Sequence, residues 1–322
     1  MTGTAQTSAD SRVLKRFTAM AGHQRLAHAY LFHGPSGSGK WTTAVNVARA
    51  LNCDVNSSGT DHACGECPSC QKIASGNHPD VVLVDEGTDE KIRIERVREL
   101  ISRGHLRPYE GRYKVVLIRH ADMMTVEAAN ALLKTLEEPS GQSLMILLTS
   151  SPQRLLSTIR SRCHGIPFFA LSRKDLVNRM ITEHQLDPPD AAFLADYCEG
   201  SYGQAVLMAE DRGQQKRDQY LKAFFGRAMK DKDLKELLAD RDATREALDM
   251  LLLWFRDVLL AKAGLPAART AHAEKQRELK QAAAKYSLIQ IREIIDDIVR
   301  TRKNVRENLN VKLPLMMLKE KL

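Results

Sequence analysis

The stretch FHGPSGSGKWTTAVNVARAL, residues 32–51, has the outline of a phosphate-binding loop followed by a helix. Such a loop reads GxxxxGK followed by Ser or Thr, because that hydroxyl holds the magnesium ion that bridges the outer phosphates. The lysine is present here, but a tryptophan without a hydroxyl follows it. The stretch therefore predicts the fold of a nucleotide hydrolase with a degenerate nucleotide-binding loop, made of Gly34, Gly37, Gly39, Lys40 and Trp41.

Composition limits the class of protein. The 322 residues exceed the usual size of one domain, so two or three domains are expected. A hydrophobic fraction of 43% can build a core, and 27% charged with only 5% aromatic residues favours a soluble, helix-rich protein. No apolar run approaches the roughly 20 residues that span a bilayer, and the first residues lack the apolar middle of a signal peptide. We expect a cytoplasmic protein.

The net charge of +8 is compatible with nucleic acid nearby, but it is spread along the chain without a dense basic run. Solvated helix faces explain most of it.

The first part of the chain alternates short apolar runs with helical stretches, which is typical of a parallel α/β sheet. Strands are expected at 29–34, 80–85, 113–118 and 143–150. The helix expected at 125–138 should end at Pro139, because proline cannot continue a helix. These elements predict a P-loop AAA+ domain of the α/β class over residues 1–169.

After residue 169 the sequence shows no convincing strand. Short helical segments at 170–212 predict a small helical lid domain. Apolar residues at i, i+3 and i+4 spacing then predict a helical bundle at 213–322, with one helix stopping at Gly264 and another pattern running from 287 to 322. This C-terminal all-α bundle is expected to be a collar used for oligomerisation.

Four cysteines lie within residues 53–70, in the segment CDVNSSGTDHACGECPSC. Two overlapping CxxC steps and one more distant cysteine can present four thiolates to a single zinc ion. Four ligands leave no place for water, so the zinc is expected to be structural. A disulfide pair or free thiols are the alternatives, and His62 is an alternative ligand, whereas Cys163 and Cys198 are expected to be ordinary buried cysteines. The expected ligands are Cys53, Cys64, Cys67 and Cys70.

The second acidic motif of P-loop ATPases is also altered. It consists of an apolar strand followed by Asp and usually Glu, which support the magnesium ion and polarise the attacking water. Here the strand VVLI is followed by Arg119 and His120, and Asp122 is interpreted as a helix cap. ATP hydrolysis in the chain's own loop is therefore not expected. Phosphate binding by the loop amides and Lys40 stays an alternative to an empty loop.

Several motifs in this order resemble the bacterial clamp-loader subunits of the AAA+ family, which belong to the DNA polymerase III holoenzyme. They are LAHAYLFHGPSGSGK, the four-cysteine insertion after the first helix, AANALLKTLEEP and TIRSRC, and the resemblance extends to LLLWFRDVLLAKAG and ENLNVKLPLMMLKEKL in the collar. The resemblance covers essentially the whole chain. It implies a hetero-pentamer with gamma or tau motor subunits and a delta subunit, which places the sliding clamp on primer-template DNA without any membrane.

In that family an arginine of an SRC motif completes the ATP site of the neighbouring subunit. The motif here is Ser161, Arg162 and Cys163, so the resemblance implies that Arg162 is an arginine finger. Arg160, two residues earlier, is expected to be able to share this role. Such a finger stabilises charge on the phosphates and is worth roughly 10^3 to 10^5 in rate in GTPases. ATP is thus expected only at the interface with a neighbour.

Four further residues bear on this expectation. Thr149 matches the position that senses the γ-phosphate in active relatives, and is expected to be structural here. Gln204 stands where active subunits usually carry a lid arginine. Glu137 and Glu138 lie at a helix C-terminus, where the helix dipole disfavours carboxylates, so a compensating group is expected at that turn.

The expected function is therefore that of a non-hydrolysing stator in a clamp loader. One alternative is an ATP-hydrolysing, gamma- or tau-like motor subunit that uses Thr42 for magnesium, although one helical residue rotates that side chain by about 100°. Another is a zinc-dependent DNA-binding module, but no basic, aromatic-rich segment flanks the cysteines.

Overall fold

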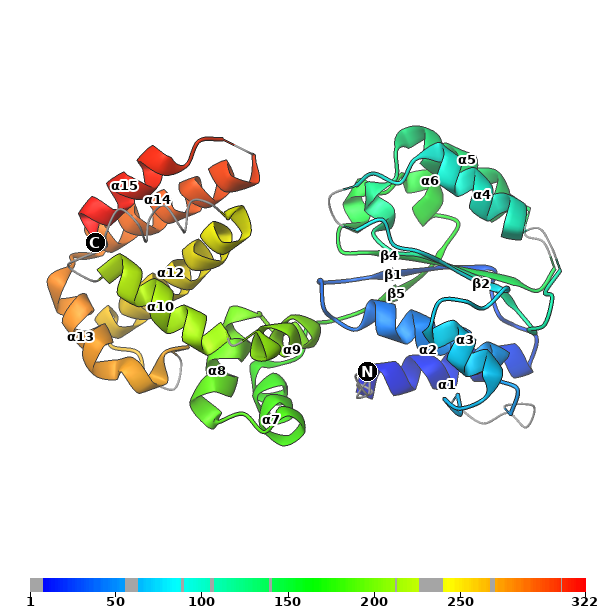
Figure 1. Ribbon diagram of the computed structural model, residues 1–322, viewed down its shortest axis with the longest axis horizontal. Coiled ribbons are helices and arrows are strands. Elements are labelled where there is room, and N and C mark those ends of the chain that lie inside the picture. The colour runs from blue at the N-terminus through cyan, green and yellow to red at the C-terminus, as the bar shows by residue number, and fades with distance from the viewer. Residues whose placement is uncertain are drawn as a thin grey trace. The chain divides into compact units, whose positions relative to one another are not determined.

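The computed structural model describes residues 8–55, 63–87, 90–104, 107–138, 141–211, 213–225, 240–266, 270–307 and 309–322. The chain forms two compact units, residues 1–170 and 171–322 (Figure 1). Among the described helices, none combines the length and the apolar character that a membrane span requires.

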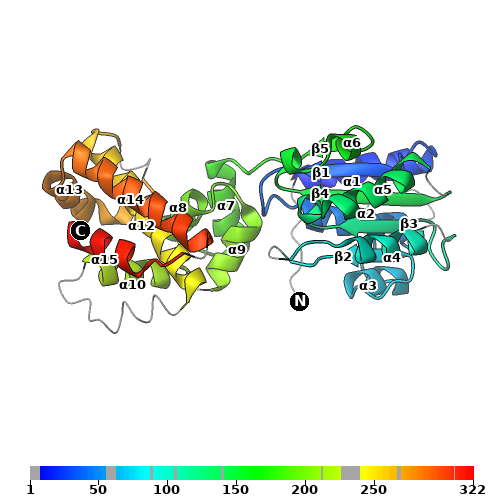
Figure 2. The same cartoon turned by 90° about the horizontal axis from the view of Figure 1, so that it is seen from above.

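The first unit is built on a five-stranded sheet in which every strand pairs in parallel with its neighbours. The strand order is β2-β3-β4-β1-β5, and Figure 2 shows the strands side by side in this order. The strands are β1 Ala29–His33, β2 Val81–Val84, β3 Lys114–Ile118, β4 Ser143–Thr149 and β5 His164–Pro167. The α/β class predicted from the sequence is confirmed.

Four of these strands were predicted, and β5 was not. It is a four-residue edge strand whose sequence HGIP has neither an apolar run nor alternation, and most of it is exposed. Glycine and proline are tolerated there because an edge strand has one free side. The pairing of β5 with β1 is therefore a feature that only the folded chain reveals.

Helices cover both faces of the sheet, which gives three layers (Figure 1). The alternation of β3 explains the two cores: Val115 and Leu117 face one layer of helices, and Val116 and Ile118 face the other. The first layer contains α1 Ser8–Gly22, α2 Lys40–Asn52 and α3 Pro68–Ala74, and the second contains α4 Ile94–Gly104, α5 Val126–Glu137 and α6 Ser157–Arg160.

The interpretation of Asp122 as a helix cap is wrong. Asp122 lies in a short 3₁₀ helix, Ala121–Met123, and α5 is capped by Thr125, whose hydroxyl accepts a hydrogen bond from the N–H of Ala128. Thr125 lies immediately before the first helical residue, where a side-chain oxygen reaches the free N–H groups of the first turn. Pro139, which was expected to end this helix, lies outside the described residues.

The second unit is entirely helical within its described residues. Its helices are α7 Arg173–His184, α8 Pro188–Tyr197, α9 Tyr202–Glu210, α10 Gly213–Phe225, α12 Arg241–Lys262, α13 Gln276–Lys285, α14 Leu288–Arg306 and α15 Lys312–Lys321. One hydrophobic core is formed by residues of α10, α12, α13, α14 and α15. Another gathers α7, α8 and α9 around Phe193 and includes Met250 and Leu253 of α12. The separation at residue 212 into a lid and a collar stays a prediction.

The helix boundaries follow local signals. Helix α12 ends just before Gly264, as predicted, and Gly264 adopts a φ of +74°, which suits glycine at a helix end. Ser287 and Gln290 form a capping box at the start of α14. The apolar pattern predicted over 287–322 is divided into α14 and α15, a break that helical periodicity alone does not show.

Candidate functional site

The glycine loop connects β1 to α2 at the carboxyl end of the sheet. Gly34 follows the strand directly and lies against the backbone of Phe168, just beyond β5. A Cβ atom at residue 34 would lie 2.0 Å from the carbonyl oxygen of Phe168, and the φ of Gly34 is +148°. Only glycine fits this close approach. Gly34 is therefore explained by packing against β5, without reference to a nucleotide.

Lys40 is turned back onto its own loop. Its Nζ donates hydrogen bonds to the carbonyl oxygens of Gly34 at 2.6 Å and Pro35 at 2.5 Å, and to Ser38 Oγ at 3.3 Å. Burial lowers the pKa of Lys40 to about 8, with Asp122 opposing this shift and Arg119 adding to it. Binding a phosphate through Lys40 would require these three bonds to break, so the loop is satisfied by its own groups.

The two motifs that should share a magnesium ion contact each other instead. The guanidinium carbon of Arg119 lies 5.5 Å from the ring centroid of Trp41, within the range of a cation–π interaction. Arg119 Nη1 also donates to Asp85 Oδ2 at 2.6 Å, at the end of the neighbouring strand β2. A positive charge thus lies where a magnesium ion would need an acid, and it repels a cation there.

His120 and Thr149, which lie near Arg119, make contacts within the first unit. His120 adopts a left-handed φ of 52°, and burial, together with Arg119, lowers its pKa, so its imidazole tends to be neutral. Thr149 is buried, and its hydroxyl donates to Asp122 Oδ1 at 2.5 Å and accepts from the N–H of Ser151. These contacts occupy the Thr149 hydroxyl within the first unit.

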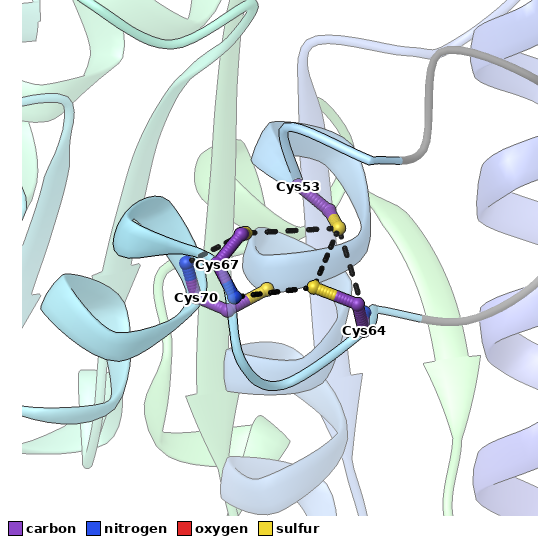
Figure 3. Close-up of side chains that lie close together, drawn as sticks. All are labelled: Cys53, Cys64, Cys67 and Cys70. Carbon is purple, nitrogen blue, oxygen red and sulfur yellow. Dashed lines mark hydrogen bonds between the residues drawn. The ribbon is translucent and has the colours of Figure 1, made fainter.

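The four cysteines come together at the other end of α2. Cys53 follows the helix directly, and Cys67 is the N-cap residue of α3. All four sulfur atoms lie within 4.8 Å of one another, with Cys53 Sγ at 3.5 Å from Cys64 Sγ and 3.9 Å from Cys67 Sγ. Figure 3 shows the four side chains turned toward one another.

These distances fit one metal ion better than disulfides. Zn–S bonds of about 2.3 Å in a tetrahedron place sulfurs about 3.8 Å apart, whereas a disulfide bond is about 2.05 Å long. The backbone N–H groups of Cys64, Cys67 and Cys70 donate to the sulfur atoms of Cys53, Cys64 and Cys67, respectively. The residues present therefore suit a closed four-thiolate zinc site. His62, the alternative ligand, lies outside the described residues.

The protonation of these thiols depends on burial and hydrogen bonding. Burial favours the neutral form of Cys53, but hydrogen bonds with the backbone and side chain of Cys64, together with those of Val55 and Cys70, outweigh it and lower the pKa of Cys53. Burial raises the pKa of Cys70 to about 12, and a bound zinc ion would deprotonate such a thiol. Burial likewise raises the pKa values of Cys163 and Cys198 to about 12, in keeping with inert structural cysteines.

The described residues 53–55 and 63–70, which carry the four cysteines, are called the cysteine module here. A buried polar network, which the sequence did not reveal, ties this module to the edge of the sheet. Asp80, fully buried before β2, accepts from the backbone N–H groups of Tyr109, Glu110 and Gly111 at 2.8–2.9 Å and from Lys114 Nζ at 3.3 Å. These partners lie 29 to 34 positions along the chain. Asp80 was treated only as the end of a strand, because a buried hydrogen-bonding role leaves no local pattern.

Asn52 plays the matching role beside the first cysteine. Its Oδ1 accepts from the backbone N–H groups of Arg112 and Tyr113, both at 2.9 Å, and its own carbonyl accepts from Ser69 Oγ at 2.6 Å. Ser69 Oγ in turn lies 3.1 Å from His78 Nε2. The module is therefore anchored to the loop before β3 by side chains that are nearly inaccessible to water.

Arg162 lies on the surface, just after the short helix α6. Its side chain is 36% exposed, and Nη2 donates to Glu137 Oε1 at 2.6 Å while Nη1 donates to the carbonyl of Thr158 at 3.0 Å. Ser161 Oγ also bonds to the Thr158 carbonyl, and Cys163 packs against the core below the helices. Ser161 and Cys163 thus hold the backbone on either side of Arg162.

The compensating group expected near the end of α5 is Arg162, because its guanidinium faces the carboxylate of Glu137. Gln204 lies in the first turn of α9, where its N–H donates to the capping hydroxyl of Ser201. Gln204 belongs to the second unit, and the glycine loop belongs to the first.

Comparisons with known proteins agree with this fold. Residues 9–172 match the family described as DNA polymerase III, delta subunit, and residues 212–319 match DNA polymerase III, delta subunit, C terminal. DNA polymerase III subunit delta' of Bacillus subtilis is 33% identical over 313 residues, which cover 93% of this chain and 92% of that protein. The subunit delta' of Pseudomonas aeruginosa is 45% identical over 148 residues, or 46% of this chain and 44% of that protein.

A solved structure supports the fold at lower sequence similarity. A DNA polymerase III gamma subunit-related protein of Thermotoga maritima superposes with a TM-score of 0.52 at 22% identity, covering 97% of both chains.

Proposed function

This chain belongs to the DNA polymerase III delta' family and is a clamp-loader component, and we propose that it acts there as a stator. In this role it does not hydrolyse ATP in its own loop. It donates Arg162 to the ATP site of a neighbouring motor subunit. The resemblance described above suggested this division of labour, and the geometry of the two sites supports it.

The contact between Trp41 and Arg119 carries the proposal of a silent loop. These two positions should supply the hydroxyl and the acid around one magnesium ion, but here they form a cation–π contact at 5.5 Å. The ion pair of Arg119 with Asp85 holds the guanidinium in place. A nucleotide hydrolase needs the metal to neutralise charge on the transferred phosphate, and this loop offers a fixed cation that repels it.

The position of Arg162 supports the second half of the proposal. It is on the surface, on a backbone fixed by core residues, and carries a permanent positive charge suited to phosphate oxygens. A subunit with an inactive pocket can therefore still contribute to hydrolysis next door.

The proposed partners follow from the same role. The motor subunits would be gamma or tau, with a delta subunit completing a hetero-pentamer in the cytoplasm, and the assembled complex would act on the sliding clamp and primer-template DNA. The zinc ion held by Cys53, Cys64, Cys67 and Cys70 would be structural, because its four ligands leave no open position. It would rigidify the segment between α2 and α3.

The test of this function has two arms. ATP turnover by the isolated chain should be at background level, and Lys40→Ala should not change it. In the loader reconstituted with motor and delta subunits, Arg162→Ala should leave assembly intact but lower the clamp- and DNA-stimulated ATP hydrolysis at the completed interface by at least about tenfold. Arg154→Ala, another exposed arginine of the same loop region, is the matched control.

Two results would contradict the proposal. A turnover rate of the isolated chain equal to that of a motor subunit, and abolished by Lys40→Ala, would assign the motor role instead. If the stimulated rates of ATP hydrolysis with wild-type and Arg162→Ala chains are equal, Arg162 is not the arginine finger. If Arg160→Ala alone lowers the rate, Arg160 has that role.

A further inference from the structure

The guanidinium of Arg162 is held at two points by two different elements. Glu137 Oε1 at the end of α5 accepts from Nη2 at 2.6 Å, and the carbonyl of Thr158 in α6 accepts from Nη1 at 3.0 Å. A guanidinium has five N–H donors, so three remain after these two bonds. The side chain is thus oriented in the free subunit while it keeps donors for another acceptor.

Both ends of the ion pair stand on rigid backbone. Leu136, next to Glu137, and Ile159, in the turn before Arg162, are almost fully buried in the same hydrophobic core. The N–H of Arg162 also bonds to the carbonyl of Ile159 at 3.1 Å. Because the two backbones are fixed through one core, the fold sets the distance between the backbone positions of Glu137 and Arg162.

Glu137 occupies an unfavourable place for a carboxylate. It is the last residue of α5, where the negative end of the helix dipole repels it, and Glu138 adds a second negative charge. Lysine or arginine would suit this turn better. A residue that breaks a local rule while pairing with a functional group suggests a role beyond stability.

We propose that Glu137 is a positioning residue for Arg162, one that holds the guanidinium ready for the phosphates of a neighbour's ATP. This inference rests on the proposed arginine-finger function. An unrestrained arginine side chain loses conformational entropy when it binds a phosphate. Because Glu137 already restricts the rotamers of Arg162 in the free subunit, less entropy is lost on binding. An exposed ion pair is weak, so Glu137 cannot hold Arg162 against a multiply charged phosphate.

The opposite role, in which Glu137 sequesters Arg162, makes the opposite prediction. Removing the charge of Glu137 would then raise hydrolysis instead of lowering it. Both roles keep the fold unchanged, so activity of the assembled loader separates them.

The experiment uses the reconstituted loader with clamp and primed DNA and compares Glu137→Gln with Glu138→Gln. The first substitution keeps the shape and an acceptor oxygen but removes the charge. Glu138 is the matched control, since in the described part of the chain it makes no ion pair. Glu137→Gln should lower the stimulated kcat about three- to fivefold with KM for ATP unchanged, and Glu138→Gln should match the wild type.

Four further measurements separate positioning from a structural role. The wild-type advantage over Glu137→Gln should shrink as ionic strength rises, because salt screens an exposed pair. Glu137→Asp, which keeps the charge, should recover part of the rate. In an Arg162→Ala background, Glu137→Gln should have no further effect. The thermal unfolding midpoint of the isolated Glu137→Gln chain should not fall, since the substitution relieves repulsion at the helix end.

The failures can be told apart. A rate loss with Arg162→Ala but none with Glu137→Gln overturns the positioning role alone. A higher rate with Glu137→Gln, an equal loss with Glu138→Gln, or a further loss in the Arg162→Ala background also overturns it. An unchanged rate with Arg162→Ala overturns both the finger and its positioning residue.

Discussion

The two ends of helix α2 carry sites of opposite completeness. At Lys40 the glycine loop has the backbone of a nucleotide site but lacks the magnesium hydroxyl and the acids of the next motif. At Cys53 a full set of four thiols lies within 4.8 Å, as a structural metal requires. One helix therefore joins a loop explained by packing to four thiols whose spacing suits a metal ion.

The difference shows what each chemistry requires of the chain. A nucleotide site draws on several separate segments, and two of the residues that such a site would use, Trp41 and Arg119, form a cation–π contact here. The four thiols, by contrast, all come from residues 53–70, just after α2 and at the start of α3. The predictions below test this contrast from its strongest to its weakest consequence.

The largest effect is expected at the metal end of the helix. Cys70→Ser should abolish stoichiometric zinc binding and lower the free energy of unfolding of the first unit by at least about 4 kcal/mol, because metal binding and local folding are coupled. Metal analysis and denaturant unfolding measure both quantities. Cys198→Ala, in the second unit, should keep the metal. A metal-free wild-type protein with four reduced thiols and an unchanged fold would refute the site.

A smaller effect is expected where the module joins the sheet. Asp80→Asn should lower the free energy of unfolding by about 3 kcal/mol, because it leaves Lys114 buried beside a neutral group and weakens three backbone hydrogen bonds. Asp85→Asn, which affects the exposed pair with Arg119 and one hydrogen bond from the N–H of Gly87, should lower the free energy of unfolding by less than about 1 kcal/mol. Equal costs for the two variants would show that the buried network does not anchor the module.

The stabilisation by Asp80 should also depend on pH. Burial opposes ionisation, but the N–H groups of Gly111, Tyr109 and Glu110, with Lys114, hold the pKa of Asp80 below its ordinary value of 3.8. A lowered folded pKa means that the stabilisation is complete above the unfolded pKa and is lost as pH falls through the folded one. The difference between wild type and Asp80→Asn should therefore be constant near neutrality and shrink below about pH 4.

The smallest effect is expected at the loop end. The double substitution Trp41→Thr and Arg119→Asp returns a hydroxyl and an acid and removes a repelling cation. It should raise the affinity of the isolated chain for ATP with magnesium about tenfold, as measured by calorimetry. Each single substitution should achieve less. Tight, magnesium-dependent binding of ATP by the wild-type chain would contradict the contrast between the two ends of α2.

Much of the fold was predictable because it depends on local patterns. Buried runs predicted β1 to β4, and the cysteine spacing indicated which thiols would meet. The edge strand β5 was missed because its four residues are mostly exposed and carry no apolar pattern. Asp122 was misassigned, since a cap is defined by geometry and Thr125 takes that place.

By itself, the sequence determined the α/β class, the loss of the magnesium residues and the set of four cysteines, because these depend on residue type and short spacing. The tertiary structure decided which distant residues meet: Trp41 with Arg119, Asp80 with the loop before β3, and Glu137 with Arg162. Those pairs join different segments, and their geometry exists only after the sheet and its covering helices have packed.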